Sequence, residues 1–79
     1  GQMEAALKTH KELAMEVDEA GESDGYVYEE LGECLQALSR ESEASPWFRK
    51  AYNELSEDGW LVDNEPDRLA RLRLLGGVQ

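Results

Sequence analysis

The chain has 79 residues, of which 41% are hydrophobic and 33% are charged, and its formal net charge at pH 7 is −10. This composition is too apolar for a disordered tail, contains no apolar run long enough to span a bilayer, and fits one small domain. The surplus of acids opposes binding to a nucleic-acid backbone and favours a basic partner.

Residues 3–20 are predicted to form an amphipathic helix. Apolar side chains recur there at spacings of three and four, and Lys and Glu fill the rest of the helical wheel. The apolar set is Met3, Ala6, Leu7, His10, Leu13, Ala14 and Val17. Gly21 is expected to end this helix because glycine readily takes the left-handed conformation, and Ser23 or Asp24 can cap the next one.

The next two segments predict a pair of helices joined by a short polar loop. The first runs from about Gly25 to Ser39, and its inward face carries Tyr28, Leu31, Leu35 and Leu38. The second begins with Ser42 as its expected cap, contains Pro46 in its first turn, where a missing backbone donor is tolerated, and reaches about Leu55. Its apolar set is Ala44, Trp47, Phe48, Ala51, Tyr52 and Leu55. Gly59 is expected to mark the end of this second helix.

The C-terminal part contains an apolar patch and one more helix. Residues 60–62 are apolar, and the following Asn-Glu-Pro-Asp places a proline and an acid where a helix start favours them. The predicted last helix runs from Pro66 to Leu75 and is closed by Gly76 and Gly77. No sustained alternation of β-branched residues predicts a strand, so the fold class is all-α.

An internal repeat gives the most specific signal in the sequence. Residues 24–29 read DGYVYE and residues 58–63 read DGWLVD, a separation of 34 residues. The same offset pairs Leu35 with Leu69 and Leu38 with Leu72, so the inward face of a helix recurs together with the turn before it. The chain is therefore predicted to be a helical repeat array.

The repeat resembles the tetratricopeptide family. Its first helix has an aromatic residue, Leu-Gly and a large residue at the family's spacing, and its second helix has the small, aromatic, small pattern. The matching residues are Tyr28, Leu31, Gly32, Leu35, Ala44, Phe48 and Ala51. The resemblance implies a superhelical array of about four antiparallel helices, whose small residues let two helices approach closely while aromatic rings fill the space alongside.

This resemblance divides one domain, residues 1–79, into three parts. Residues 3–20 form a flanking helix, residues 25–58 a complete repeat, and residues 59–79 a partial, terminating repeat. Two positions depart from the family pattern: Ser56 stands at the usual closing proline, and Pro66 stands 34 residues after Gly32, so the third unit's first helix must break or start late. The alternative interpretation is an ordinary helical bundle.

No residue pattern predicts an enzyme, a metal or another cofactor. His10 and Cys34 are the main candidates for chemistry, but one histidine and one cysteine cannot supply a usual zinc set or an internal disulfide. Acids flank Cys34 rather than the cations that would activate a thiolate. Lysines and acids also interrupt the N-terminal segment where a secretory signal needs an apolar core, so we expect a cytoplasmic, non-catalytic protein.

The resemblance also implies where a partner binds. First helices of tetratricopeptide repeats line a concave groove, and at those positions this chain has Tyr26, Glu29, Glu33 and Gln36. The expected function is an interaction module whose acidic face takes a basic protein or peptide. Two alternatives stay open: self-association into a homo-oligomer that buries Leu7, Leu13 and Val17, and a non-catalytic tail of a larger protein.

Overall fold

A computed structural model describes residues 2–78 and contains five helices and no strand within that range. The helices are α1 (Gln2–Glu19), α2 (Gly25–Ala37), α3 (Glu41–Leu55), α4 (Gly59–Asn64) and α5 (Pro66–Leu75). The all-α class predicted from the sequence is confirmed. The helix expected at residues 3–20 is α1, and the complete repeat expected at residues 25–58 contains α2 and α3.

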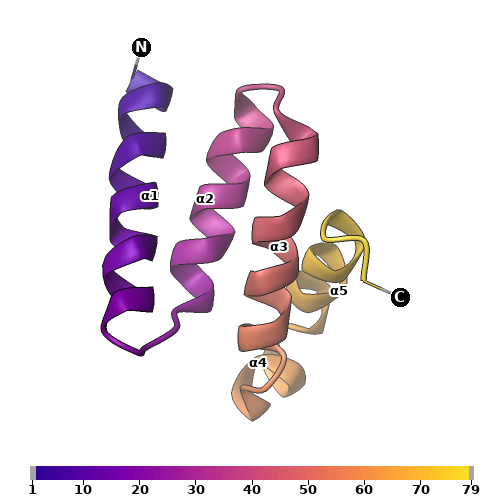
Figure 1. The fold of residues 1–79 in the computed structure, drawn as a ribbon. Helices are drawn as coiled ribbons and strands as arrows, with labels where there is room; N and C mark the ends of the chain where they lie inside the picture. The colour runs from indigo at the N-terminus through magenta and orange to yellow at the C-terminus, as the bar shows by residue number, and fades with distance from the viewer. Residues whose placement is uncertain (1, 79) are drawn as a thin grey trace.

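Successive helices pack on one another in chain order. α1, α2 and α3 stand side by side and alternate in direction, α5 lies beside α3, and the short α4 sits below the lower end of α3 (Figure 1). α1 packs on α2, α2 on α3, α3 on α5 and α4 on α5. The row therefore has two ends, α1 at one and α5 at the other, and the two termini lie at these opposite ends (Figure 1).

Side-chain caps and left-handed residues set most helix limits. Asp24 caps α2, since its carboxylate accepts hydrogen bonds from the backbone N–H groups of Tyr26 and Val27. Gly21 has a φ of 73° and lies in a turn where the N–H of Glu22 donates to the carbonyl of Val17, so α1 ends as predicted.

The start of α3 differs from the prediction. The helix begins at Glu41, one residue before the expected cap Ser42, and no side chain caps it. Arg40 occupies the cap position and reaches forward to form an ion pair with Glu43, Nε to Oε2 2.5 Å. The preceding residue, Ser39, takes the left-handed conformation with a φ of 59° and closes α2. α2 therefore ends at Ala37, before the predicted Ser39, and the loop lies earlier in the chain than the sequence predicted.

The apolar residues 60–62, for which no helix was predicted, belong to a short helix. Residues 59–64 form α4, and Asp58 caps it through a hydrogen bond from the N–H of Trp60, N to Oδ1 2.9 Å. The chain then breaks at Glu65, because Pro66 starts a new helix and favours an extended residue before it. The predicted break in the third unit is present, and the helix count is five instead of about four.

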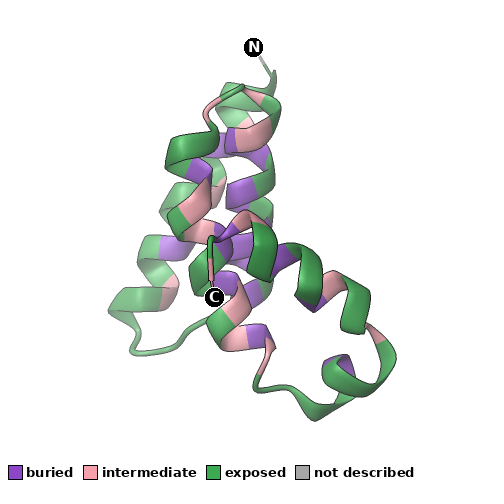
Figure 2. Ribbon diagram, turned by 90° about the vertical axis from the view of Figure 1, so that its right-hand side faces the viewer, coloured by how far each residue is buried: buried purple, intermediate pink, exposed green. Residues whose placement is uncertain are grey.

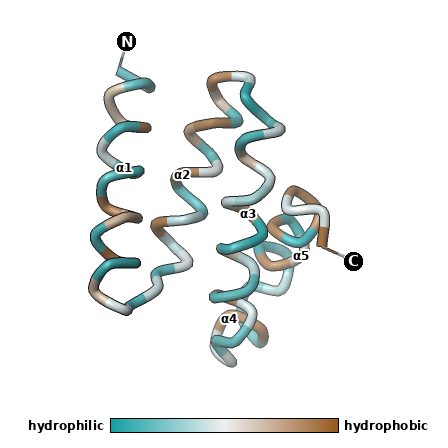
Figure 3. The backbone as a smooth tube through the Cα atoms, viewed as in Figure 1, coloured by the Kyte–Doolittle hydropathy of each residue, from teal (hydrophilic) through white to brown (hydrophobic). Residues whose placement is uncertain are grey.

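The core runs through the whole row (Figure 2). Its largest fully buried side chains are Tyr28, Phe48, Leu31, Leu35, Leu61 and Leu72. Polar and apolar segments alternate along the helices, as in amphipathic helices that bury one face (Figure 3). The closest approach of α2 to α3 differs in detail from the expectation: the ring of Phe48, instead of the alanines, covers Gly32, where an added Cβ would lie 2.9 Å from Cε1.

Candidate functional site

Two arginines of α5 reach the predicted acidic contact surface on α2, and one of them covers Glu29. Glu29 is 5% exposed, and both of its carboxylate oxygens accept from Arg68, with Nε to Oε2 3.2 Å. One turn further along both helices, Arg71 Nη1 lies 3.3 Å from Glu33 Oε2. Two arginines three residues apart on α5 thus match two glutamates four residues apart on α2.

The other two predicted contact residues lie beside this pair. Tyr26 is exposed, and the guanidinium of Arg68 lies 5.0 Å from the centre of its ring. Gln36 is half-buried one turn beyond Glu33. The structure therefore does not present Glu29 to a partner as the sequence analysis expected, because Pro66 turns α5 back toward α2 and brings Arg68 onto it.

The uneven distribution of charge along the sequence is consistent with this contact. Residues 66–79 hold three arginines against one acid, whereas residues 1–65 hold 17 acids and 5 bases. Arg68 and Arg71 of that basic end meet the acidic surface of their own chain.

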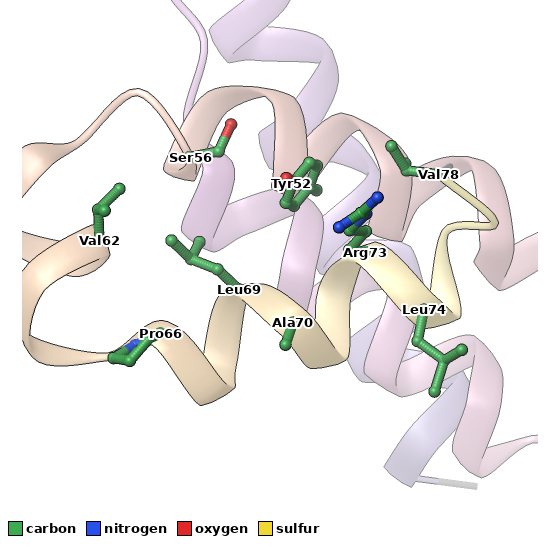
Figure 4. A pocket seen from close by; sticks show the side chains of 9 residues that line it. All are labelled: Tyr52, Ser56, Val62, Pro66, Leu69, Ala70, Arg73, Leu74 and Val78. Atoms are coloured by element: carbon green, nitrogen blue, oxygen red, sulfur yellow. The ribbon is translucent and has the colours of Figure 1, made fainter.

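A groove on the other side of α5 is the largest open cavity that we describe. It has a volume of about 670 Å³ and lies between α3, α4 and α5 (Figure 4). Its walls are mostly apolar and include Tyr52, Val62, Pro66, Leu69, Arg73 and Leu74. Leu74 is 80% exposed and Val62 is 47% exposed, and both line the groove. Exposed apolar side chains gathered at one cavity are typical of an interaction surface.

The repeat explains why this groove is apolar. Shifting Tyr28, Gly32 and Leu35 by the 34-residue period gives three residues of its wall, namely Val62, Pro66 and Leu69. In α2 those positions pack against α3: Tyr28 stacks on Trp47 with ring centres 6.1 Å apart, and Gly32 lies under Phe48. The groove wall thus has, at the repeat offset, the positions through which α2 packs against α3.

A pair of glycines at equivalent repeat positions gives a second sign of this open face. An added Cβ at Gly25, the first residue of α2, would lie 2.5 Å from Cγ of Leu55 at the end of α3. An added Cβ at Gly59, 34 residues later, would have no atom within 4 Å. The position that Leu55 fills beside α2 is therefore unfilled beside α4.

A smaller groove lies between α1 and the start of α3. Its volume is about 410 Å³, and its lining combines Leu7 and Met15 with Lys8, Lys11 and Arg40. Charged side chains dominate its rim. It therefore fits an apolar helix less well than the groove at α5.

The two residues considered for chemistry lie on neighbouring helices, His10 on α1 and Cys34 on α2. Cys34 is buried in α2, and burial, together with the nearby Glu30 and Glu33, raises the pKa of its thiol. A raised pKa keeps the thiol protonated and unreactive at neutral pH. His10 is half-buried between α1 and α2, with Nδ1 3.5 Å from a carboxylate oxygen of Glu30.

Tyr28 makes the main polar contact between α1 and α2, and this contact predicts an alkaline loss of stability. Its hydroxyl donates to Asp18 Oδ1 over 2.6 Å. Burial and this hydrogen bond raise the pKa of Tyr28 from 10.0 to about 12. Because the folded state holds the proton more tightly than the unfolded state, the stabilisation is complete below pH 10 and is lost as the pH rises toward 12.

Denaturation midpoints measured across this pH range check the prediction. Tyr28→Phe removes the ionisable group, so we expect a flatter alkaline limb from a less stable protein. Tyr26→Phe is the control, because Tyr26 is exposed and its replacement leaves the slope unchanged. Equal slopes for Tyr28→Phe and the original chain would contradict the assignment.

Within residues 2–78 no group of three or more His, Cys, Asp or Glu side chains could hold a metal ion. Over the same residues, every helix is too short or too polar to cross a membrane. In comparisons with protein-family models, with curated proteins and with solved structures, nothing matches this chain.

Proposed function

We propose that this chain is a non-catalytic protein-interaction module and that its main binding surface is the groove between α3 and α5. Its ligand is an amphipathic helix that buries apolar side chains against Leu69 and Leu74 and sets an acidic residue beside Arg73. One observation carries the proposal. The groove wall has the repeat positions that bind α3 in the complete repeat, and two of them, Val62 and Pro66, are exposed. We place this activity in the cytoplasm.

A titration with a synthetic amphipathic helix tests the groove. The probe has leucines at positions i, i+3, i+4 and i+7 and glutamates on both flanks, and the matched control has the same composition in scrambled order. Amide shifts in NMR spectra of the labelled chain report where the probe binds. We expect shifts at Val62, Leu69 and Leu74, and Leu74→Asp raises the Kd at least about tenfold because it places a charge in an apolar site.

Met15→Asp is the matched control variant, since Met15 is 61% exposed and lies on α1 outside this groove. It leaves the Kd for the probe unchanged. A probe that binds no more tightly than its scrambled form contradicts the proposal. Shifts confined to α1 and α2 contradict it as well.

A second candidate is the expected binding of a basic segment at the acidic face of α2. One observation favours it, namely that this face already holds two guanidinium groups of α5, at Glu29 and at Glu33. Glu33 is the accessible member of the pair, so a basic segment competes with Arg71 there. Glu33→Lys then reduces capture of a basic peptide and leaves the fold intact. Glu29→Lys is an unsuitable test, because it sets a buried lysine against Arg68.

A further inference from the structure

We infer that the helix that fills the groove between α3 and α5 is α1 of a second copy of this chain. This inference rests on the proposed function, since it names the partner of the same groove. Copies then join head to tail, with α5 of one copy packed on α1 of the next. The repeat register, the open face of α1 and the charges at the groove rim support it independently.

The register of α1 matches that of the missing helix. In the complete repeat, α3 packs on α2 through the face that includes Trp47 and Ala51. Shifting these positions back by 34 residues gives Leu13 and Val17 on α1. α1 thus corresponds to α3 within the repeat, and α3 is the kind of helix that the groove lacks.

This face of α1 remains open within the chain. Leu13 is 41% exposed, whereas Trp47, at the equivalent position of α3, is half-buried. Val17 is half-buried, whereas its equivalent Ala51 is fully buried. α1 packs on α2 through Leu7 and Ala14, which are buried. Docking of α1 therefore leaves its own contact with α2 in place, as α3 contacts both α2 and α5.

Charges complement each other at the rim. Arg73 lines the groove, and it is exposed. Glu16 lies on the exposed side of α1 near Leu13. An arginine at the rim and a glutamate on the docking helix attract one another in partly desolvated surroundings, and salt weakens this attraction.

The two surfaces lie at opposite ends of the row of helices, so neither closes on its own copy (Figure 1). A contact between two different surfaces of identical chains is heterologous, and it extends into a filament or closes into a ring instead of stopping at a symmetric dimer. The size of the assembly should therefore increase with protein concentration. Two variants, each with one of the two surfaces damaged, should pair with each other only once.

Sedimentation velocity on the 79-residue chain tests the inference. The original chain shows a sedimentation coefficient that rises steadily up to roughly millimolar concentration, as expected for a small interface. Leu13→Asp and Leu74→Asp each raise the Kd for association at least about tenfold, and each chain alone stays monomeric. Mixed together, they form a one-to-one dimer and nothing larger, because Leu13→Asp keeps an intact groove and Leu74→Asp keeps an intact α1.

Two controls separate the docking face from general effects. Met15→Asp lies two residues from Leu13 and on the opposite side of α1, so it leaves association unchanged. If Leu13→Asp lowers the helical circular dichroism, Glu16→Lys replaces it, since Glu16 is exposed and the change sets like charges together at Arg73. Arg73→Glu mixed with Glu16→Lys then associates better than either variant alone.

Three results overturn the inference. They are a monomeric original chain at roughly millimolar concentration, association lost in Leu74→Asp but kept in Leu13→Asp, and a mixture of the two aspartate variants that stays monomeric. If the synthetic helix binds the groove and the chain does not self-associate, the proposed function holds and this inference falls. If the synthetic helix does not bind, both fall.

Discussion

Arg68→Ala lowers the free energy of unfolding by about 2–4 kcal/mol, because it leaves the buried carboxylate of Glu29 without its cation. The loss falls below the largest losses for buried pairs because the Arg68 side chain is 31% exposed, so water partly replaces the guanidinium. For a domain of this size such a loss is a large fraction of total stability. Urea denaturation followed by circular dichroism measures it.

Arg71→Ala is the matched control. It removes the second arginine on the same face of α5, but the side chains of Arg71 and Glu33 are 44% and 47% exposed. An exposed ion pair contributes about 0–1 kcal/mol, so we expect a much smaller change. Equal losses for the two variants would contradict the distinction between a buried and an exposed pair.

A double variant identifies the physical cause of the larger loss. Glu29→Gln in the Arg68→Ala background replaces the unpaired buried charge by a neutral amide, which is less costly to bury. We expect the double variant to be more stable than Arg68→Ala alone. A double variant that is less stable would show that Arg68 acts through packing on Tyr26 instead.

Local signals predicted most of the helix limits correctly. Asp24 and Gly21 act through their own backbone neighbours, and Pro66 constrains the residue before it, so none of these effects needs a distant contact. α4 was missed although the sequence contained its signal. Asp58-Gly59 repeats Asp24-Gly25, where a helix begins, and Asp58 caps α4 as Asp24 caps α2.

The candidate sites depend on how α5 packs against the other helices, which local sequence signals do not determine. The repeat and the resemblance placed Glu29 and Glu33 on one face of α2, but where α5 lies was not predictable from that face alone. Its direction depends on the break at Glu65 and on the packing of Leu69 and Leu72 against the core. The acidic face was therefore expected to be free, and the groove on the far side of α5 was not expected.

Gly25→Ala destabilises the chain by roughly 1–3 kcal/mol, because the new methyl group overlaps the buried side chain of Leu55 and the end of α3 must shift. Gly59→Ala, at the equivalent position of the next unit, changes stability by less than about 0.5 kcal/mol, since no atom lies within 4 Å of the added Cβ. Both glycines are the first residue of their helices, so differences in helix propensity cancel in the comparison.

Thermal or urea denaturation of dilute protein gives both values, and Gly25→Ala combined with Leu55→Ala is the control that restores space at the contact. We expect Gly25→Ala to lower the free energy of unfolding by less in the Leu55→Ala background than in the original chain. Under conditions where copies associate, Gly59→Ala leaves the Kd for association nearly unchanged. The inferred junction places Gly21, 34 positions before Leu55, beside Gly59, and Gly21 has no side chain that the added methyl group would meet. Leu74→Asp, which puts a charge into the groove, therefore weakens association far more than Gly59→Ala does.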